Sequence, residues 1–386
     1  MRTLSPWHDV RIAEGIPVWH DQLDAAERAA LRPGIPDGLD RRPDVLVVGG
    51  GAQGLAAAAA CRELGLGSVV VIERDHLAAG PSGSAAGALC PEAHLDAEGP
   101  AFVEFARASL ARHEALAGAS GGRLRLRWGD WLVLPPAAAT SALAGWPGVR
   151  RLGPDDVRRL VPELGIETDG LLVPRCQALL NPRRLVLALA AAAGPVATGV
   201  EYLGLRRRGS RAEAVLTSIG EFQPGAVVVA TGVAPADLLP LPQLRVKGHL
   251  AATEPAGFAL PVVLSGLWGL EDGRLLFGGD RAPDDGTLAV DPGAIAAHRA
   301  QLDRLLPAAR GLRLTHAWAC ARPALEDRLP VLDRAPGLDN VWLTAGHYTT
   351  GLLLAPASGQ ALARWIASGA PPADAALFRL DRGARD

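Results

Sequence analysis

The stretch that decides the fold is Asp44-Val-Leu-Val-Val-Gly-Gly-Gly-Ala-Gln-Gly-Leu55, which a second apolar run, Ser68-Val-Val-Val-Ile72, follows. Short continuous apolar runs bounded by turn residues are typical of strands that are buried on both faces of a parallel sheet. Residues 52–64 predict a helix between these two strands, and Gly65 is placed to end it. The stretch therefore predicts a βαβ unit.

Glycines join the first strand to the helix in a known pattern. Gly49, Gly51 and Gly54 fit G-x-G-x-x-G, in which the glycines permit a tight turn, a close approach of a pyrophosphate and close packing of helix on strand. Phosphates would lie at the N-terminus of the helix. Glu73, at the end of the second strand, can accept a hydrogen bond from a ribose hydroxyl and would repel a 2′-phosphate. The motif favours FAD or NAD over NADP; an ordinary glycine turn is the alternative.

Two further segments favour a flavin over a nicotinamide. Small residues dominate Ala78–Pro91, so the backbone there can lie against an extended ligand. Residues 345–357 join a predicted strand, 341–345, to a predicted helix, 356–367, and so direct backbone amides towards one place. A flavin that accepts hydride gains negative charge, which a helix N-terminus stabilises.

Composition limits the classes of protein. The chain has 386 residues, enough for about two domains, and a formal charge of −2 gives no reason to expect nucleic acid or a membrane as a partner. Lys247 is the only lysine, so Schiff-base chemistry would depend on it. Residues 1–15 do not resemble a signal peptide, and the four cysteines form no C-x-x-C pair. We expect a cytoplasmic protein with reduced thiols and no metal.

The rest of the chain predicts an α/β domain that antiparallel β-structure interrupts. Residues 1–43 form an arm with one short helix, 23–31, which we expect to pack on the body or on a second subunit; a lid is the alternative. Hairpins are predicted at 123–134, with Gly129-Asp130 at the turn, and at 262–277, with the turn at 271–273. The remaining predicted helices are 101–117, 182–193 and 292–306, and the remaining predicted strands are 214–218 and 226–230.

Seven blocks in order resemble those of one superfamily. The chain is similar to the D-amino-acid oxidase superfamily of FAD-dependent oxidoreductases, and most similar to its glycine oxidase (ThiO-like) branch, over about residues 44–380. The resemblance implies a Rossmann-type FAD-binding domain in several segments (44–100, 173–238 and 317–386) and a substrate-binding domain with a mainly antiparallel sheet (101–172 and 239–316). The blocks are the glycine motif with Glu73-Arg74, Ser82–Leu89, Asn181–Arg184, Val227–Gly232, Val246–Gly248, Trp318–Pro323 with Asp327 and Pro330, and Gly346–Pro356.

The resemblance also assigns roles to residues. Arg322 is expected to pair with a substrate carboxylate; an ion pair with Asp327 or Glu326 is the alternative. Tyr348, Trp268 and His347 are the other expected catalytic residues. The expected FAD-binding residues are Gly49, Gly51, Ala52, Gln53, Gly54, Glu73, Arg74, Ser82, Ser84, Ala85, Ala86, Gly87, Ala88, Leu89, Val200, Thr231, Gly232, Gly346, Thr349, Thr350, Gly351 and Leu352.

Some positions depart from the family pattern. Thr349 replaces a second arginine of the glycine oxidases, and Trp268 stands where a substrate-contacting tyrosine is expected, unless it only packs in the core. Glycine is therefore a doubtful substrate. Cys320 coincides with the cysteine that carries covalent flavin in the sarcosine oxidase branch; an inert buried thiol is the alternative. His347 either fixes the backbone or carries a proton.

The expected function is FAD-dependent oxidation of an amino acid or N-substituted amino acid, with hydride transfer from Cα to flavin N5, an imine or keto product and H2O2. One alternative is a dehydrogenase subunit that passes electrons to a protein or quinone, because Lys247 lies outside the strand in which some relatives carry a lysine that assists O2. A non-catalytic flavin-binding scaffold and an NAD-linked dehydrogenase are the others. The expected partners are the substrate, O2 or another acceptor, and a possible second copy of the chain.

Overall fold

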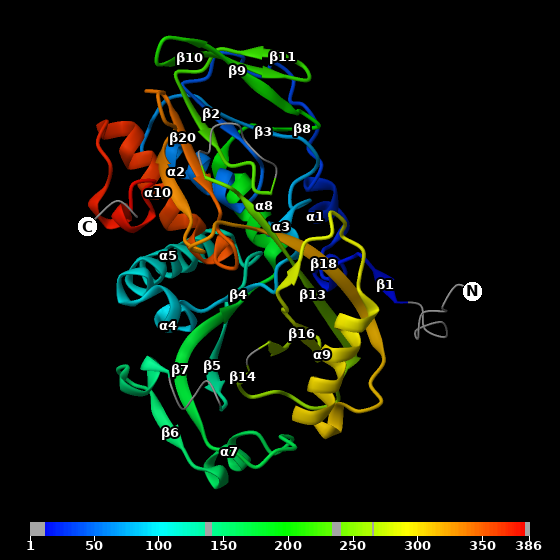
Figure 1. Cartoon of the computed structure of the whole chain (residues 1–386). Coiled ribbons are helices and arrows are strands. Elements are labelled where there is room, and N and C mark those ends of the chain that lie inside the picture. The colour runs from blue at the N-terminus through cyan, green and yellow to red at the C-terminus, as the bar shows by residue number, and fades with distance from the viewer. Residues whose placement is uncertain (1–11, 136–140, 234–240, 265, 383–386) are drawn as a thin grey trace.

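The structure is a computed structural model, and it describes residues 12–135, 141–233, 241–264 and 266–382. Among these residues, six strands form one sheet. Five of the strands run parallel to one another, and the edge strand β19 runs antiparallel to them. The predicted βαβ unit is confirmed at its centre (Figure 1). In sheet order the strands are β19 (Val331–Arg334), β20 (Val341–Ala345), β12 (Ala226–Val229), β2 (Val45–Val48), β3 (Val69–Glu73) and β8 (Val196–Thr198).

The two faces of this sheet are covered differently. Val45 and Val47 pack in one apolar cluster with helices, whereas Leu46 and Val48 pack in another with a small antiparallel sheet. Side chains alternate along a strand, so each strand contributes to both clusters and reads as continuously apolar. The helices are α2 (Ala52–Glu63), α5 (Pro100–Ala119), α8 (Pro182–Ala193) and α10 (Gly351–Ser368); the small sheet is β9 (Tyr202–Arg208), β10 (Arg211–Thr217) and β11 (Gly220–Phe222).

A second, larger sheet of the described residues is mainly antiparallel, as predicted, and lies beside the first (Figure 1). The long strands β18 and β13 pair near one end of it, and β5 and β7 pair near the other end. Its strands are β1 (Ala13–Glu14), β4 (Ala88–Leu89), β5 (Arg127–Val133), β6 (Arg150–Leu152), β7 (Gly170–Leu179), β13 (Leu244–Pro255), β14 (Val263–Leu264), β15 (Leu267–Gly269), β16 (Arg274–Gly278), β17 (Ala282–Pro283) and β18 (Leu314–Ala324).

The described part of the N-terminal arm packs on the body, as the sequence led us to expect. β1 pairs in parallel with β18, and Val18 and Trp19 are buried. The remaining helices are α1 (Ala25–Ala30), α3 (Pro81–Ser84), α4 (Leu95–Glu98), α7 (Pro154–Leu160) and α9 (Pro292–Leu305), with short 3-10 turns η1 (Val18–His20), η2 (Pro91–His94), η3 (Ala142–Gly145), η4 (Pro307–Ala309) and η5 (Ala373–Phe378).

Two predicted elements are wrong. Gly129-Asp130 is not a hairpin turn: it lies inside β5, which pairs with β7, and it marks an irregularity in that pairing. Helix α10 begins at Gly351 rather than at Pro356. Proline cannot donate to the carbonyl four residues before it, so Leu352 O is left over, and His113 Nε2 lies 3.0 Å from that oxygen. His113 thereby lets the helix run through the proline.

The second predicted hairpin is confirmed, because β15 and β16 are antiparallel around residues 271–273. Its first arm also turns back on itself as β14 and β15. The domain boundaries stay a prediction; those at 172/173 and 316/317 fall within β7 and β18. In the described part of the chain, no helix combines the length and the apolar character that crossing a membrane requires.

Candidate functional site

A cavity of about 580 Å³ opens at the carboxyl ends of the parallel strands. Val48, Glu73, Ala230 and Ala345, at or next to the ends of four neighbouring strands, all line it. Open α/β sheets bind their ligands in this position. Most of the expected site residues share the wall: Gly49, Gly51, Ala52, Gln53, Glu73, Arg74, Ser82, Ala85–Ala88, Val200, Thr231, Gly232, Trp268, Cys320, Arg322, Gly346, His347, Tyr348, Thr349, Gly351 and Leu352.

The glycine motif has the geometry that its sequence predicts. Gly49 has φ +116°, and a Cβ there would lie 2.3 Å from Ala230 O. A Cβ on Gly54 would lie 2.0 Å from Gly49 O, so only glycine lets the helix sit this close to the strand. The amide of Ala52, in the first turn of α2, donates to Ser82 Oγ at 3.0 Å. The start of α2 therefore faces the cavity.

Glu73 is held by the backbone on both sides. Its Oε2 accepts from the amide of Gly50 at 2.7 Å, and its Oε1 accepts from the amide of Asp75 at 2.9 Å. A carboxylate oxygen has a second lone pair, so both oxygens can still accept from a hydroxyl in the cavity. The carboxylate is thus fixed in position before any ligand arrives.

Two tryptophans orient the small-residue loop, and sequence reasoning assigned neither of them to the site. Trp19, from the arm, donates from Nε1 to Ala85 O at 2.8 Å, and Trp318, from β18, donates from Nε1 to Ser84 O at 2.8 Å. Both indoles are almost fully buried, so these bonds are shielded from water. Successive carbonyls of the loop are therefore fixed by rigid side chains from distant parts of the chain.

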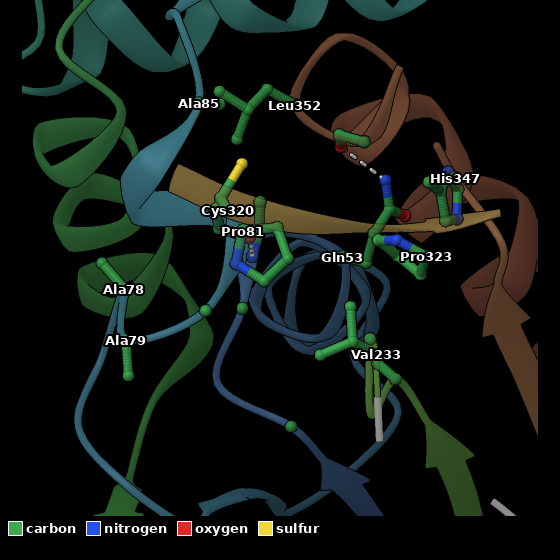
Figure 2. Close-up of a pocket in the computed structure, with 18 of the residues that line it drawn as sticks. Gln53, Ala78, Ala79, Pro81, Ala85, Val233, Cys320, Pro323, His347 and Leu352 are labelled. Atoms are coloured by element: carbon green, nitrogen blue, oxygen red, sulfur yellow. Dashed lines mark hydrogen bonds between the residues drawn. The ribbon is translucent and has the colours of Figure 1, made fainter. Parts of the chain in front are cut away.

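A second network joins the start of α2 to the loop before α10. Gln53 Nε2 donates to Gly351 O at 2.7 Å (Figure 2), and Gln53 Oε1 accepts from Thr344 Oγ1 at 3.2 Å. Thr344 Oγ1 also lies 2.7 Å from His347 Nε2. Burial lowers the pKa of His347 to about 3, so its ring is neutral at neutral pH. The geometry favours a backbone-fixing role for His347.

Tyr348 and Thr349 line the cavity, and Thr349 is the residue that replaces the second arginine of the glycine oxidases. Tyr348 has φ +44°, and its amide donates to Pro323 O at 2.6 Å. Two cations lie near its ring, since the guanidinium carbons of Arg281 and Arg328 are 5.9 Å and 6.0 Å from the ring centre. Thr349 is exposed.

Arg322 reaches the cavity from β18 and is half-buried. Its guanidinium lies flat against Gly248, where a Cβ would come within 2.3 Å of Nη1, and its Nη1 donates to Asp280 O at 2.8 Å. Within the described residues no carboxylate pairs with it, and Asp327 instead pairs with Arg382. The alternative of an internal ion pair with Asp327 is therefore not what the structure contains.

The residue that seats Arg322 is itself clamped, which the sequence did not indicate. The Asp280 carboxylate accepts from His249 N at 2.6 Å and contacts His249 Nδ1 at 2.9 Å and His298 Nε2 at 3.1 Å. Burial disfavours the charged form, but the hydrogen bonds from the two histidines outweigh it and hold the pKa of Asp280 below its usual range. Asp280 thus stays ionised.

Cys320 and Trp268 lie on the cavity wall with Arg322. In Figure 2 the Cys320 side chain points to the side on which Ala85 and Leu352 lie. Burial raises the pKa of the Cys320 thiol, and the Arg322 charge only partly opposes it. Trp268 is half-buried and packs against the apolar cluster that includes Trp318, and its Nε1 has no hydrogen-bond partner among the described residues.

Four expected cofactor-binding residues do not reach the wall in the described structure. Gly54 packs against Gly49, and the carbonyl of Ser84 is bound by Trp318. Leu89 is fully buried in an apolar cluster, and Thr350 Oγ1 donates to His347 O at 2.8 Å. These residues support the wall from behind.

Comparison with known proteins decides the family. Residues 44–365 match the family described as FAD dependent oxidoreductase, DAO. The chain belongs to this family. The family predicted from the sequence is therefore confirmed, and an NAD-linked dehydrogenase is ruled out as the family assignment.

Relatives of this DAO-family chain include glycine oxidases. The bifunctional protein ThiO/ThiG of Synechocystis sp. is 33% identical over 81% of this chain and 50% of its own length. A glycine oxidase of Bacillus licheniformis is 28% identical over 85% of this chain and 94% of its own length. The chain spans about half the length of the first two curated relatives it matches. The solved glycine oxidase of Geobacillus kaustophilus is 25% identical, with a TM-score of 0.77 over 88% of this chain and 99% of that one.

Proposed function

We propose that this DAO-family chain oxidises the amine of an amino acid or N-substituted amino acid with FAD. The observation that carries the proposal is the Arg322 guanidinium, which lines the cavity without a carboxylate partner among the described residues. A guanidinium binds a carboxylate through two parallel hydrogen bonds and keeps its charge at any working pH. It is therefore suited to hold the α-carboxylate of a substrate.

The wall of the cavity supports FAD as the cofactor. Glu73 and Val200 line the cavity from the parallel sheet and are joined by a backbone hydrogen bond, whereas Cys320 and Arg322 line it from β18 of the other sheet, as an extended ligand with a ribose and a reactive ring would require. Gly49 and Gly54 leave no room for a Cβ, and Gly51 and Ala52 at the start of α2 line the cavity, where a helix N-terminus would attract phosphates. The bound flavin would supply N5 as the acceptor for the hydrogen of the substrate Cα.

The residues of the chain would orient the substrate rather than move protons. Arg322 would fix the carboxylate, and Tyr348, whose amide donates to the carbonyl of the adjacent Pro323, would limit the pose of the side chain. Trp268 lines the same cavity from β15. His347 is neutral and buried, so it is not set up to collect a proton at neutral pH. The amine would therefore bind in its neutral form, and the imine product would hydrolyse to a keto compound in solution.

We propose O2 as the electron acceptor and H2O2 as its product, with a dehydrogenase as the second candidate. One observation favours the second candidate: Lys247, the only lysine, is 3% exposed and bound to Asp285 at 2.8 Å and 3.0 Å. It does not line the described cavity wall, so no ammonium is free there to assist O2. A cytoplasmic location and a homo-oligomer stay predictions.

The test is a panel of amino acids, N-methyl amino acids and simple amines added to the FAD-loaded protein without oxygen. We expect amino acids to bleach the flavin absorbance, and glycine and sarcosine to do so slowly because of Thr349 and Trp268. Admission of air separates the two candidates: rapid H2O2 release supports the oxidase, and slow reoxidation supports the dehydrogenase. A flavin that no compound bleaches would indicate a non-catalytic scaffold and contradict the proposal.

A further inference from the structure

Two cysteines that are far apart in the sequence meet in the structure. Cys90 Sγ lies 3.6 Å from Cys176 Sγ, and the two residues are 86 positions apart. Both are free thiols and both are buried, with 7% and 6% of their surface exposed. A disulfide would need a sulfur–sulfur distance of about 2.05 Å, so the thiols are in contact but not bonded.

A buried carboxylate shares this place. Glu92 is 5% exposed, and one of its carboxylate oxygens lies within 4.8 Å of both sulfurs. Its Oε1 pairs with Arg107 Nη2 at 2.7 Å, whereas its Oε2 is buried and has no hydrogen-bond partner among the described residues. A buried acceptor without a donor is costly, so this oxygen is suited to bind a ligand.

The local fold aims the three side chains at one point. Cys90 is the N-terminal cap of the 3-10 turn η2, and Glu92 lies in that turn. Cys176 lies in β7, where residues 174–176 face Asp130 alone between the pairs Gly129↔Gln177 and Trp131↔Val173. The extra residues bulge out of the sheet and turn Cys176 towards η2.

We propose that Cys90, Glu92 and Cys176 bind one zinc ion, with water as the fourth ligand. Two zinc–thiolate bonds of about 2.3 Å at a tetrahedral angle separate the sulfurs by about 3.8 Å, close to the distance observed. A linear two-thiolate site would need about 4.6 Å. The Glu92 oxygen would have to move inwards by at most about 1.3 Å to reach the tetrahedral sulfur–oxygen separation of about 3.5 Å.

The charges at the site support a divalent cation. Zinc would displace one proton from each thiol into solvent, and no electrons would be transferred. Two thiolates and one carboxylate with Zn²⁺ give a net charge of −1, which the Arg107 guanidinium balances. The Glu92–Arg107 pair would then be an outer contact that fixes a metal ligand.

The site lies beside the cavity wall but is separate from it. Cys90 follows β4, whose Ala88 lines the cavity, and β4 pairs with β7. Zinc would therefore tie the small-residue loop to β7. The spacing of cysteines in the sequence argued against zinc, since no C-x-x-C pair exists, but pairing of β4 with β7 brings single cysteines together.

The test uses the full-length FAD-loaded protein, stripped of metal with a chelator under reducing conditions and then given ZnCl2. We expect inductively coupled plasma mass spectrometry to find one zinc ion per chain. In competition with a chelator of known affinity, Cys176→Ala and Glu92→Gln should each weaken zinc binding at least about 100-fold. Cys61→Ala is the matched control, because Cys61 is a fully buried free thiol in another part of the fold. The Cys61→Ala variant should bind zinc with the affinity of the unaltered protein.

Three results would overturn the proposal. They are an unaltered protein that retains no zinc, a Cys61→Ala variant that loses zinc as the other two variants do, and a Cys90–Cys176 disulfide that forms in air, with O2 as the oxidant, as fast in the presence of zinc as in its absence. Because the zinc content of the unaltered protein is measured first, the proposal stays testable if a variant does not fold.

Discussion

Asp280 positions Arg322, and its replacement by asparagine tests how far substrate binding depends on that contact. The two side chains have the same shape, but the amide keeps only one acceptor oxygen and has no charge. In the structure Asp280 Oδ1 contacts His249 N and His298 Nε2, and Oδ2 contacts His249 Nδ1. Asp280→Asn would keep the first pair of contacts with a neutral acceptor and place an NH2 group against His249 Nδ1.

The cost follows from the hydrogen bonds. Neutral acceptors are weaker than charged ones by about 1 kcal/mol for each bond, and two bonds are affected. His249 would have to move its proton to Nε2, which is buried and has no partner among the described residues, at about 1–3 kcal/mol. We therefore expect about 3–5 kcal/mol of local destabilisation. A displacement of Arg322 by about 1 Å would then raise KM for an amino acid about 10- to 100-fold.

The assay is steady-state kinetics with the best substrate of the panel, together with urea unfolding and the FAD content. Asp285→Asn is the matched control, because Asp285 pairs with buried Lys247 and does not contact Arg322. Both variants should be less stable, but only Asp280→Asn should raise KM. If Asp280→Asn loses stability as calculated and keeps its KM within about twofold, the positioning role is refuted.

Three further predictions concern stability and cofactor binding. Burial lowers the pKa of His113 to about 4, so between pH 6.5 and pH 4 the unfolded chain binds a proton that the folded chain does not. The free energy of unfolding should therefore fall by up to about 1.4 kcal/mol for each pH unit in this range. Urea unfolding of His113→Gln should show a smaller dependence on pH. Trp19→Phe leaves Ala85 O without its donor and should weaken FAD binding about 5- to 100-fold by fluorescence titration, whereas unchanged affinity would contradict the role of the arm. Gly54→Ala should abolish FAD binding or folding, because its Cβ would lie 2.0 Å from a backbone oxygen; Gly153→Ala, which meets nothing within 4 Å, should behave like the unaltered protein by circular dichroism.

Local patterns in the sequence were enough to predict the parallel unit and most of the cavity wall. The glycine motif and the block from Gly346 to Leu352 act largely through their own backbone, and the Glu73 carboxylate lies at the end of the adjacent strand β3, so their positions follow from neighbouring residues. The predicted start of α10 was wrong because proline is common at the first residue of a helix, and Pro356 looks like that residue in the sequence. The carbonyl that this proline leaves without a donor is contacted by His113, more than two hundred residues earlier in the chain.

The contacts that support the site could not be predicted, because they depend on the register of long-range pairing. Trp19 and Ala85 are 66 residues apart, and Arg322 and Asp280 are 42 residues apart. Nothing in the local sequence marks either partner. The same holds for Cys90 and Cys176, which become neighbours only once β4 pairs with β7.

The central claim is that Arg322 binds the carboxylate of an amino acid over a flavin. The most direct measurement is the anaerobic reduction of bound flavin by the best amino acid and by its decarboxylated amine, in the unaltered protein and in Arg322→Ala. Arg207→Ala, which changes an exposed arginine of β9, is the control. We predict that the Arg322→Ala variant keeps its FAD, binds the amino acid about 100-fold or more weakly, and binds the amine with unchanged affinity. An Arg322→Ala variant that the amino acid reduces with the affinity of the unaltered protein would contradict the claim.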